Sequence, residues 1–277
     1  MNVSRPEPAG EPAWLLPPPP TASAQALTLL CVPHAGAGPG IYRPFARPLA
    51  PRVALRPVHL PGRESRIGER AFENVTDAVK ALVPRLVPQL RGRFAVWGHS
   101  MGGFVAFELA RVLEARFGMR AEGLVISGCQ APRSPGRELL PQRRELSDNA
   151  LWSSAVELNG IPEGVMRSRE LKALLLPTLR ADFAVFETYA YREGRRLSCP
   201  VHVFAGEGDF EAPAADMQTW EEETRSAFRL TEMPGGHFFH LDDVTGFSDL
   251  LADALCGQRA GQNDRQAVTS RAVRTPG

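Results

Sequence analysis

The strongest chemical signal in the sequence is the segment at residues 98–102, Gly-His-Ser-Met-Gly. Its G-x-S-x-G pattern is typical of a nucleophilic serine at a tight turn between a strand and a helix. An apolar run at residues 94–97 precedes the motif and an amphipathic run at residues 102–116 follows it, which is the context that the motif requires. A glycine-rich turn whose serine caps a helix is the alternative interpretation. We predict that Ser100 is a nucleophile.

A serine nucleophile needs a base, and in this strand-turn-helix arrangement the base is a histidine that comes last in the chain. His237 lies in a glycine-rich loop directly after an apolar run, which suits a base that shuttles protons between nucleophile and leaving group. His240 is the second candidate. His202 lies inside an apolar run, so we expect it to be packed against a helix layer.

An acid must orient the base, and it is expected between the serine and the histidine in the chain. Asp209 follows the apolar run at residues 201–206 and is the predicted acid. Glu207 and Asp182 compete for this role, but Glu207 is very close to the strand and Asp182 lies in a helical insertion. A turn-forming role is the non-catalytic alternative for Asp209.

Two backbone N–H groups are expected to bind the oxyanion that attack by the serine creates. The amide of Met101 lies at the start of a helix, where N–H groups are free and the helix dipole favours negative charge. The amide of Ala35 lies in a loop of small residues, 33–38, after the first apolar run. His34, in the same loop, precedes the serine in the chain and is expected to shape the loop.

Alternating short apolar runs and amphipathic runs must position these residues. The strand-like runs are residues 26–33, 53–60, 94–98, 124–128, 201–206 and 228–233. The main helical runs are residues 75–90, 102–116, 216–223 and 244–255. This alternation predicts an α/β protein with a mostly parallel central sheet and helices on both faces. We expect a disordered Pro-rich arm at residues 1–26, a domain at residues 27–255 and a disordered tail at residues 256–277.

One stretch of about sixty residues, at about 135–196, contains no strand-like run. Its helical patterns at residues 171–178 and 182–191 predict an inserted helical lid over the carboxyl edge of the sheet; helices that only pack, without gating, are the alternative. Leu174, Leu175, Phe183, Phe186 and Tyr189 recur there at near-helical spacing. Most should be core contacts. We predict that Phe183, Phe186 and Tyr189 line a substrate channel, because acyl pockets are mostly apolar.

Composition narrows the classes of function. The net charge of +1, from 32 basic and 31 acidic residues, predicts no broad attraction to nucleic acid or anionic membranes. The four cysteines have neither C-x-x-C spacing nor histidines at ligand spacing, so we expect packed thiols and no metal site. Neither a signal pattern nor a membrane-length apolar run is present, which predicts a cytoplasmic protein. We also expect no cofactor.

Five segments occur together and in order across residues 27–255, and together they resemble type II thioesterases of polyketide and nonribosomal-peptide biosynthesis. They are Pro33-His34-Ala35-Gly36, Leu60-Pro61-Gly62-Arg63-Glu64, Gly98-His99-Ser100-Met101-Gly102-Gly103, Leu176-Pro177-Thr178-Leu179-Arg180-Ala181-Asp182 and Gly235-Gly236-His237-Phe238. The resemblance implies the α/β-hydrolase fold, a triad of Ser100, Asp209 and His237, and Ala35 and Met101 as oxyanion donors.

The same resemblance implies a substrate and a partner. Enzymes of this kind remove stalled or aberrant acyl groups from the phosphopantetheine arm of an acyl or peptidyl carrier protein. The arginines within residues 133–144 are then a candidate docking patch for such a carrier. A carboxylesterase or lipase that cleaves oxygen esters is one alternative, because no triad residue distinguishes sulfur from oxygen leaving groups. A non-catalytic binding protein with the hydrolase fold is the other.

Overall fold

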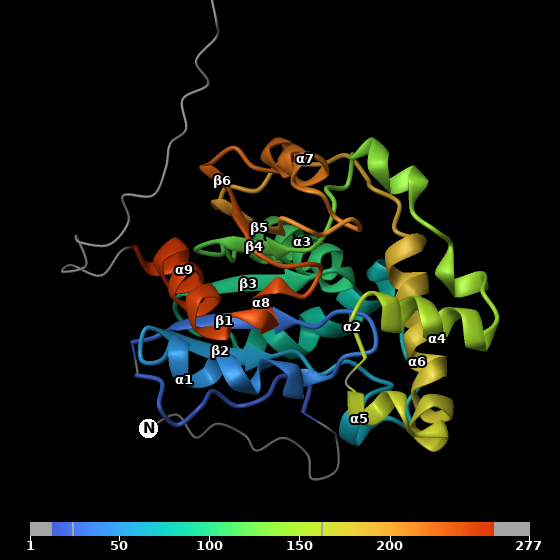
Figure 1. Cartoon of the computed structure of the whole chain (residues 1–277). Coiled ribbons are helices and arrows are strands. Elements are labelled where there is room, and N and C mark those ends of the chain that lie inside the picture. Colours follow the sequence, from blue (N-terminus) through green and yellow to red (C-terminus); the bar gives the residue numbers. More distant parts are fainter. Residues whose placement is uncertain (1–12, 24, 162, 258–277) are drawn as a thin grey trace, which may run out of the picture.

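A six-stranded parallel sheet forms the centre of the protein (Figure 1). The computed structural model describes residues 13–23, 25–161 and 163–257. The strands are β1 (Leu27–Val32), β2 (Val53–Pro57), β3 (Phe94–His99), β4 (Leu124–Ser127), β5 (Val201–Gly206) and β6 (Phe228–Met233). Their order across the sheet is β2-β1-β3-β4-β5-β6, and every neighbouring pair is parallel. The α/β class and all six predicted strands are confirmed.

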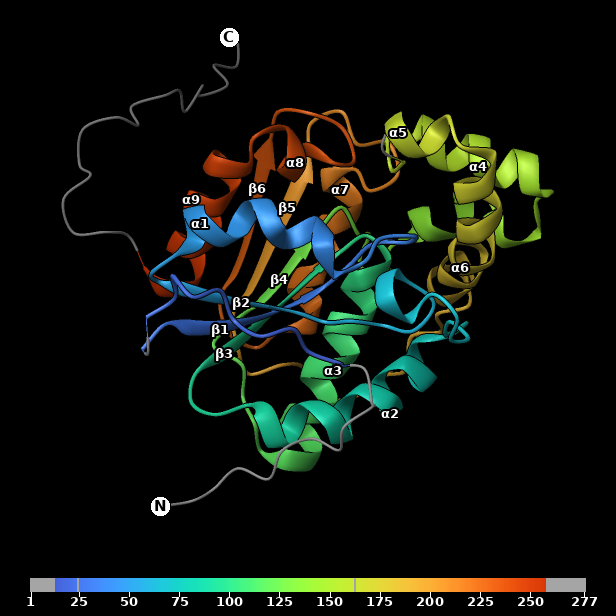
Figure 2. The same cartoon turned by 90° about the horizontal axis from the view of Figure 1, so that it is seen from below.

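Helices cover both faces of the sheet, as Figure 2 shows. On one face lie α2 (Val75–Leu86) and α3 (Met101–Phe117), and on the other α1 (Ala46–Leu49) and α9 (Val244–Cys256). Alternate residues of each strand point to opposite faces. Leu30 of β1 accordingly packs with α2 and α3, whereas Leu29 packs with α1 and α9.

Several short helices complete the frame. They are α7 (Ala214–Met217), α8 (Phe239–Asp242) and 3₁₀ turns at Pro39–Phe45, Glu64–Arg66, Val87–Gln89, Pro135–Leu139, Arg143–Glu145 and Gln218–Glu223. Of the helices in the described ranges, none combines the length and apolarity that crossing a bilayer requires.

The predicted insertion between β4 and β5 is helical and contains no strand among its described residues. It consists of α4 (Asp148–Glu157), α5 (Glu163–Met166) and α6 (Arg169–Glu187), which lie together at one side of the sheet (Figures 1 and 2). The two helical patterns predicted at residues 171–178 and 182–191 belong largely to one continuous helix, α6, which carries Pro177 in its interior. The insertion has its own small core, which contacts Ala35. Gating by this lid remains a prediction.

The predicted Pro-rich arm is shorter than expected. Leu15 is buried and forms an antiparallel bridge with Val58, just beyond β2. The guanidinium of Arg66 lies 4.0 Å from the centre of the Trp14 ring, close enough for a cation–π contact. At residues 14 and 15, where disorder was expected, apolar side chains therefore pack on the domain. The predicted disorder of residues 1–12 and 258–277 lies outside the described residues.

Candidate active site

Ser100 occupies the tight turn between β3 and α3. Its backbone angles, φ 53° and ψ −125°, are strained for a residue with a side chain. A Cβ on Gly98 would collide with the carbonyl oxygen of Gly102, and a Cβ on Gly102 would collide with that of Val32. Both glycines of the motif are thus required by close backbone approach, and they let the serine project at the end of the sheet.

Ser100, His237 and Asp209 form a continuous hydrogen-bonded chain. His237 Nε2 lies 3.0 Å from Ser100 Oγ, and His237 Nδ1 lies 2.8 Å from Asp209 Oδ2. The other carboxylate oxygen of Asp209 accepts the backbone N–H groups of Glu211 and Ala212, at 2.9 and 3.1 Å. A carboxylate only accepts hydrogen bonds, so Nδ1 carries the hydrogen and Nε2 is free to accept the serine hydroxyl. The arrangement can therefore take a proton from Ser100.

The competing candidates have other partners. His240 is 2% exposed, and its ring packs 4.1 Å from that of His99. Asp182 accepts two hydrogen bonds from the guanidinium of Arg63. His202, on β5, is half-buried, and burial lowers its pKa.

Three buried histidines surround His237. The ring of His99 lies 5.1 Å from that of His237 and 5.6 Å from that of His34, measured between centroids. Burial lowers the pKa of His34 to about 3, helped by the charges of His237 and Arg63. Burial also lowers the pKa values of His99 and His240 well below the usual range, and neighbouring histidines add to the effect. These three rings are therefore neutral at pH 7.

The cavity at Ser100 is small, and the helical insertion forms part of its wall. Its volume is about 20 Å³, room for about one water molecule. The two predicted oxyanion donors and two of the three predicted channel residues belong to its wall, with side chains from the lid and from the loop after β5. The lining residues are Ala35, Ser100, Met101, Gly128, Gln130, Arg143, Leu158, Phe183, Phe186, Glu211 and His237.

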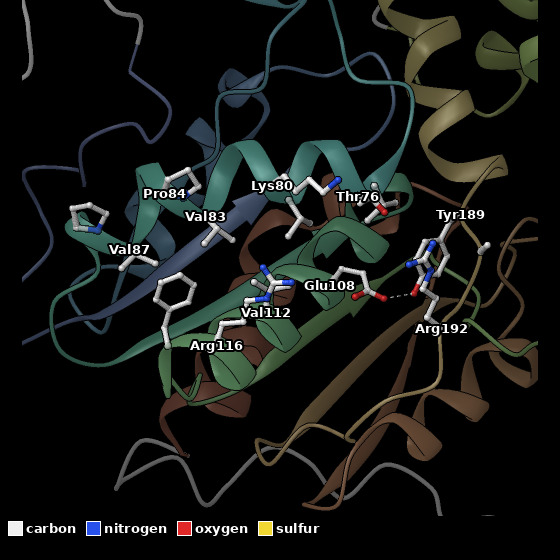
Figure 3. A pocket seen from close by; sticks show the side chains of 15 residues that line it. Thr76, Lys80, Val83, Pro84, Val87, Glu108, Val112, Arg116, Tyr189 and Arg192 are labelled. Atoms are coloured by element: carbon white, nitrogen blue, oxygen red, sulfur yellow. Dashed lines mark hydrogen bonds between the residues drawn. The ribbon is translucent and has the colours of Figure 1, made fainter.

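Tyr189, the third predicted channel residue, lies elsewhere. It lines a separate groove of about 590 Å³ along α2 and α3, which Figure 3 shows. Its hydroxyl donates a hydrogen bond to Glu108 at 2.7 Å. Its ring stacks on Phe104 at 4.3 Å, and Phe104 stacks in turn on Phe186 at 5.3 Å. Two aromatic rings therefore separate Tyr189 from the Ser100 cavity, and its assignment to the channel beside Ser100 is wrong.

An ion pair in the cavity wall was not predicted. Arg143, in the lid, donates two hydrogen bonds to the carboxylate of Glu211, at 2.8 and 2.6 Å. Glu211 follows Asp209 by two residues, and nothing in the local sequence links it to an arginine 68 residues away. The guanidinium of Arg143 also lies 5.5 Å from the centre of the Phe183 ring. The lid is thus tied to the loop that carries Asp209.

The predicted arginine patch at residues 133–144 is mostly engaged within the protein. Arg133 forms ion pairs with Glu193 and Glu223. Arg137 donates to the backbone carbonyls of Pro132 and Tyr189. Arg144 pairs with Glu145 and Glu187. With Arg143 held by Glu211, three of the four arginines are paired with carboxylates. Arg137 has no carboxylate partner among the described residues, but its guanidinium lies over the rings of Phe104 and Tyr189.

All four cysteines are free, and Cys31, Cys129 and Cys199 are buried. Burial raises the pKa of each of these three thiols, so they behave as packed apolar groups. Within the described ranges, no group of three or more His, Cys, Asp or Glu side chains is arranged to hold a metal ion.

Comparisons with known proteins agree with this geometry. A family model described as a thioesterase domain matches residues 27–255. The chain is 36% identical over 247 residues to thioesterase PikA5 of Streptomyces venezuelae, covering 88% of this chain and 86% of that protein. The solved structure of BorB, a type II thioesterase from the borrelidin biosynthetic cluster, has a TM-score of 0.81 at 34% identity and covers 89% of this chain and 99% of that one. RedJ, a thioesterase from the prodiginine biosynthetic pathway in Streptomyces coelicolor, has a TM-score of 0.78 at 31% identity, covering 90% of this chain and 96% of that one. The chain therefore belongs to the thioesterase domain family, as an enzyme of the α/β-hydrolase fold similar to the type II thioesterases of natural-product biosynthesis.

Proposed function

We propose that the protein hydrolyses acyl groups from the phosphopantetheine arm of acyl or peptidyl carrier proteins, and so removes stalled or aberrant intermediates of a polyketide or nonribosomal-peptide pathway. The observation that carries the proposal is the Ser100–His237–Asp209 chain, with distances of 3.0 and 2.8 Å. Relatives named for such pathways support the choice of substrate. The free thiols are typical of a reducing compartment, which favours the cytoplasm.

The chemistry is acyl transfer through an acyl-enzyme. Ser100 Oγ attacks the thioester carbonyl while His237 Nε2 takes the hydroxyl proton, and Asp209 stabilises the imidazolium. The amides of Ala35 and Met101 bind the tetrahedral oxyanion, each lowering the barrier by about 3 kcal/mol. The C–S bond then breaks, and the thiolate takes the proton from His237. Water, deprotonated by the same histidine, attacks the acyl-enzyme and releases the acid. No step needs a cofactor, because the substrate itself carries the phosphopantetheine.

The lid has to move for this reaction to occur. The cavity of about 20 Å³ has room for about one water molecule but for no acyl group. Phe183 and Phe186 of α6 line the cavity. We therefore assign these two side chains to the acyl channel. The ion pair between Arg143 of the lid and Glu211 of the loop after β5 is assigned as a contact that breaks when the lid opens.

The test is the rate of hydrolysis of one acyl group offered on a carrier protein, on coenzyme A and as a simple oxygen ester. We expect the highest kcat/KM for the carrier-bound form. Replacing Ser100 by Ala should lower turnover at least about a thousandfold. Near-normal hydrolysis by S100A would overturn the nucleophile assignment, and preference for the oxygen ester would indicate a carboxylesterase. Failure of Ser100 to react with a fluorophosphonate would favour a binding protein instead.

A further inference from the structure

Arg63 and Asp182 form a buried ion pair beside the active site. They lie 119 residues apart in the chain, and both side chains are 2% exposed. Asp182 Oδ1 accepts from Arg63 Nη2 at 2.8 Å, and Asp182 Oδ2 accepts from Arg63 Nη1 at 3.0 Å. Arg63 also donates to the carbonyl oxygen of Pro61 at 3.1 Å. The contacts with Asp182 and Pro61 therefore hold the guanidinium in one orientation.

The same pair forms hydrogen bonds with the loop that carries the Ala35 amide. Asp182 Oδ2 accepts the backbone N–H of Gly36 at 2.7 Å, and Arg63 Nη1 donates to the carbonyl oxygen of Ala37 at 3.1 Å. The N–H of Ala37 donates in turn to the carbonyl of His34 at 3.1 Å. The peptide group directly after Ala35 is thus fixed by Asp182, and the turn around it is closed. In contrast, the N–H of Ala35 makes no hydrogen bond to any described residue.

Neighbouring residues of both segments add further ties. Thr178, one turn before Asp182 on α6, donates its hydroxyl hydrogen to the carbonyl of Gly62, next to Arg63. Glu64, the residue after Arg63, accepts the N–H of Gly40 at 2.8 Å. The segment at residues 60–64 therefore bridges the loop at residues 33–40 on one side and α6 on the other.

We propose that the Arg63–Asp182 pair positions the oxyanion hole, and that it makes the hole depend on the seating of lid helix α6. Arg63 and Asp182 are positioning residues, since they reach the reacting atoms only through the Ala35–Ala37 backbone. If α6 lifts to admit an acyl group, Asp182 leaves the Gly36 amide, and the Ala35 amide loses its support until the helix seats again. Full transition-state stabilisation then requires a closed lid over the bound substrate. This inference rests on the proposed function, which assigns the oxyanion to Ala35.

The test uses two variants. In R63K the ammonium keeps the charge but cannot reproduce the fork that reaches Asp182 and Ala37 together. In the double variant R63M/D182L, apolar side chains of similar size replace the buried pair, a change that is often neutral for stability or even stabilising. We expect kcat to fall about 10- to 100-fold in both variants, because a small misplacement of a catalytic group has an effect of this size. KM should change less than about threefold, because ground-state binding does not use the oxyanion donors.

A second readout separates positioning from simple loss of structure. An acyl trifluoromethyl ketone forms a tetrahedral adduct with Ser100 whose oxyanion occupies the hole. Its inhibition constant should rise by the same factor by which kcat/KM falls. The matched control is D148N, which breaks an exposed ion pair of Asp148 with Arg180, on α6 two residues from Asp182. We expect D148N to retain wild-type kcat and inhibitor affinity.

Wild-type kcat and inhibitor affinity in a folded R63M/D182L would overturn the proposal; if the double variant fails to fold, the same result for R63K overturns it. S100A, assayed alongside, separates a failure of the proposed function from a failure of the role assigned to the Arg63–Asp182 pair. If S100A hydrolyses thioester at the wild-type rate, the proposed function itself is wrong. If S100A is inactive while R63K is unimpaired, only the role of the ion pair is wrong.

Discussion

Replacing Gly128 by alanine should disturb the active site through a single methyl group. Gly128 follows β4 with φ +54°, and it lines the Ser100 cavity. The added Cβ would lie 2.7 Å from Cε1 of His99 and 3.2 Å from Cε1 of His237, where ordinary carbon contacts begin at 3.4 Å. His99 is fully buried and is held by a 3.0 Å hydrogen bond to Ser127. The clash with His99 forces that ring or the Gly128 backbone to shift, and His237 must also give way by a few tenths of an ångström, which disturbs its 3.0 Å contact with Ser100.

Backbone strain and overpacking together determine how much stability the G128A variant loses. A left-handed backbone costs an alanine about 1–2 kcal/mol, and overpacking of a tight interior costs about 1–3 kcal/mol. Together they predict a fall in the free energy of unfolding of about 2–5 kcal/mol. The shift of the histidine should lower kcat between about tenfold and a hundredfold.

The assay combines thiol release from an acyl thioester with urea denaturation of the same samples. The matched control is G68A, because a Cβ on Gly68 meets no atom within 4 Å and its φ is not left-handed. We expect G68A to behave as the wild type in both measurements. A G128A enzyme with wild-type kcat and stability would refute the steric argument.

Three further predictions concern pH and the aromatic wall. Since the pKa of His34 is about 3 in the folded protein and about 6.5 when unfolded, only the unfolded chain gains this proton between the two values. His34 alone should therefore leave the free energy of unfolding unaffected above pH 7 and lower it by about 2 kcal/mol at pH 5, in addition to the drop that the buried His99 and His240 cause. Urea denaturation at both pH values checks this, and the free energy of unfolding of H34Q should fall less between pH 7 and pH 5 than that of the wild type. An equal fall in both proteins would contradict a neutral His34. Phe186→Ala enlarges the cavity beside Ser100, so the ratio of kcat/KM for long over short acyl chains should rise about tenfold; equal losses at every chain length would contradict this role. Tyr189→Phe removes only the hydrogen bond to Glu108, so it should lower the free energy of unfolding by about 1 kcal/mol and leave the chain-length profile unchanged; a shifted profile would return Tyr189 to the channel.

The parts of the fold and site that could be predicted are those with local signatures. The motif around Ser100 requires glycines for steric reasons, and these reasons are visible in the backbone of Gly98 and Gly102. The loops that carry Asp209 and His237 each follow a strand, and parallel strands bring their carboxyl ends to one edge of the sheet. The motif, the order of the residues along the chain and their placement in loops after strands were therefore enough to choose the three side chains that meet.

Features that depend on tertiary contacts were missed. Two helical patterns, at residues 171–178 and 182–191, were predicted where one helix, α6, runs through Pro177 from Arg169 to Glu187. The pairing of Arg63 with Asp182 joins two segments far apart in the chain, and no periodicity encodes such a partner. Tyr189 has the same spacing as Phe186, but the end of α6 at Glu187 turns it toward a different surface.

The N-terminal segment has a consequence for how the protein is handled. Strand β2 lies at an edge of the sheet, and just beyond its end His59 donates its N–H to the carbonyl of Trp14, while Leu16 donates to the carbonyl of Pro57. Uncovered groups at a sheet edge can pair with a second molecule and lead to aggregation. A chain shortened to residue 27, where the family match begins, would expose them. Truncations for expression should therefore keep residues 13–16, which cover the backbone groups at that edge.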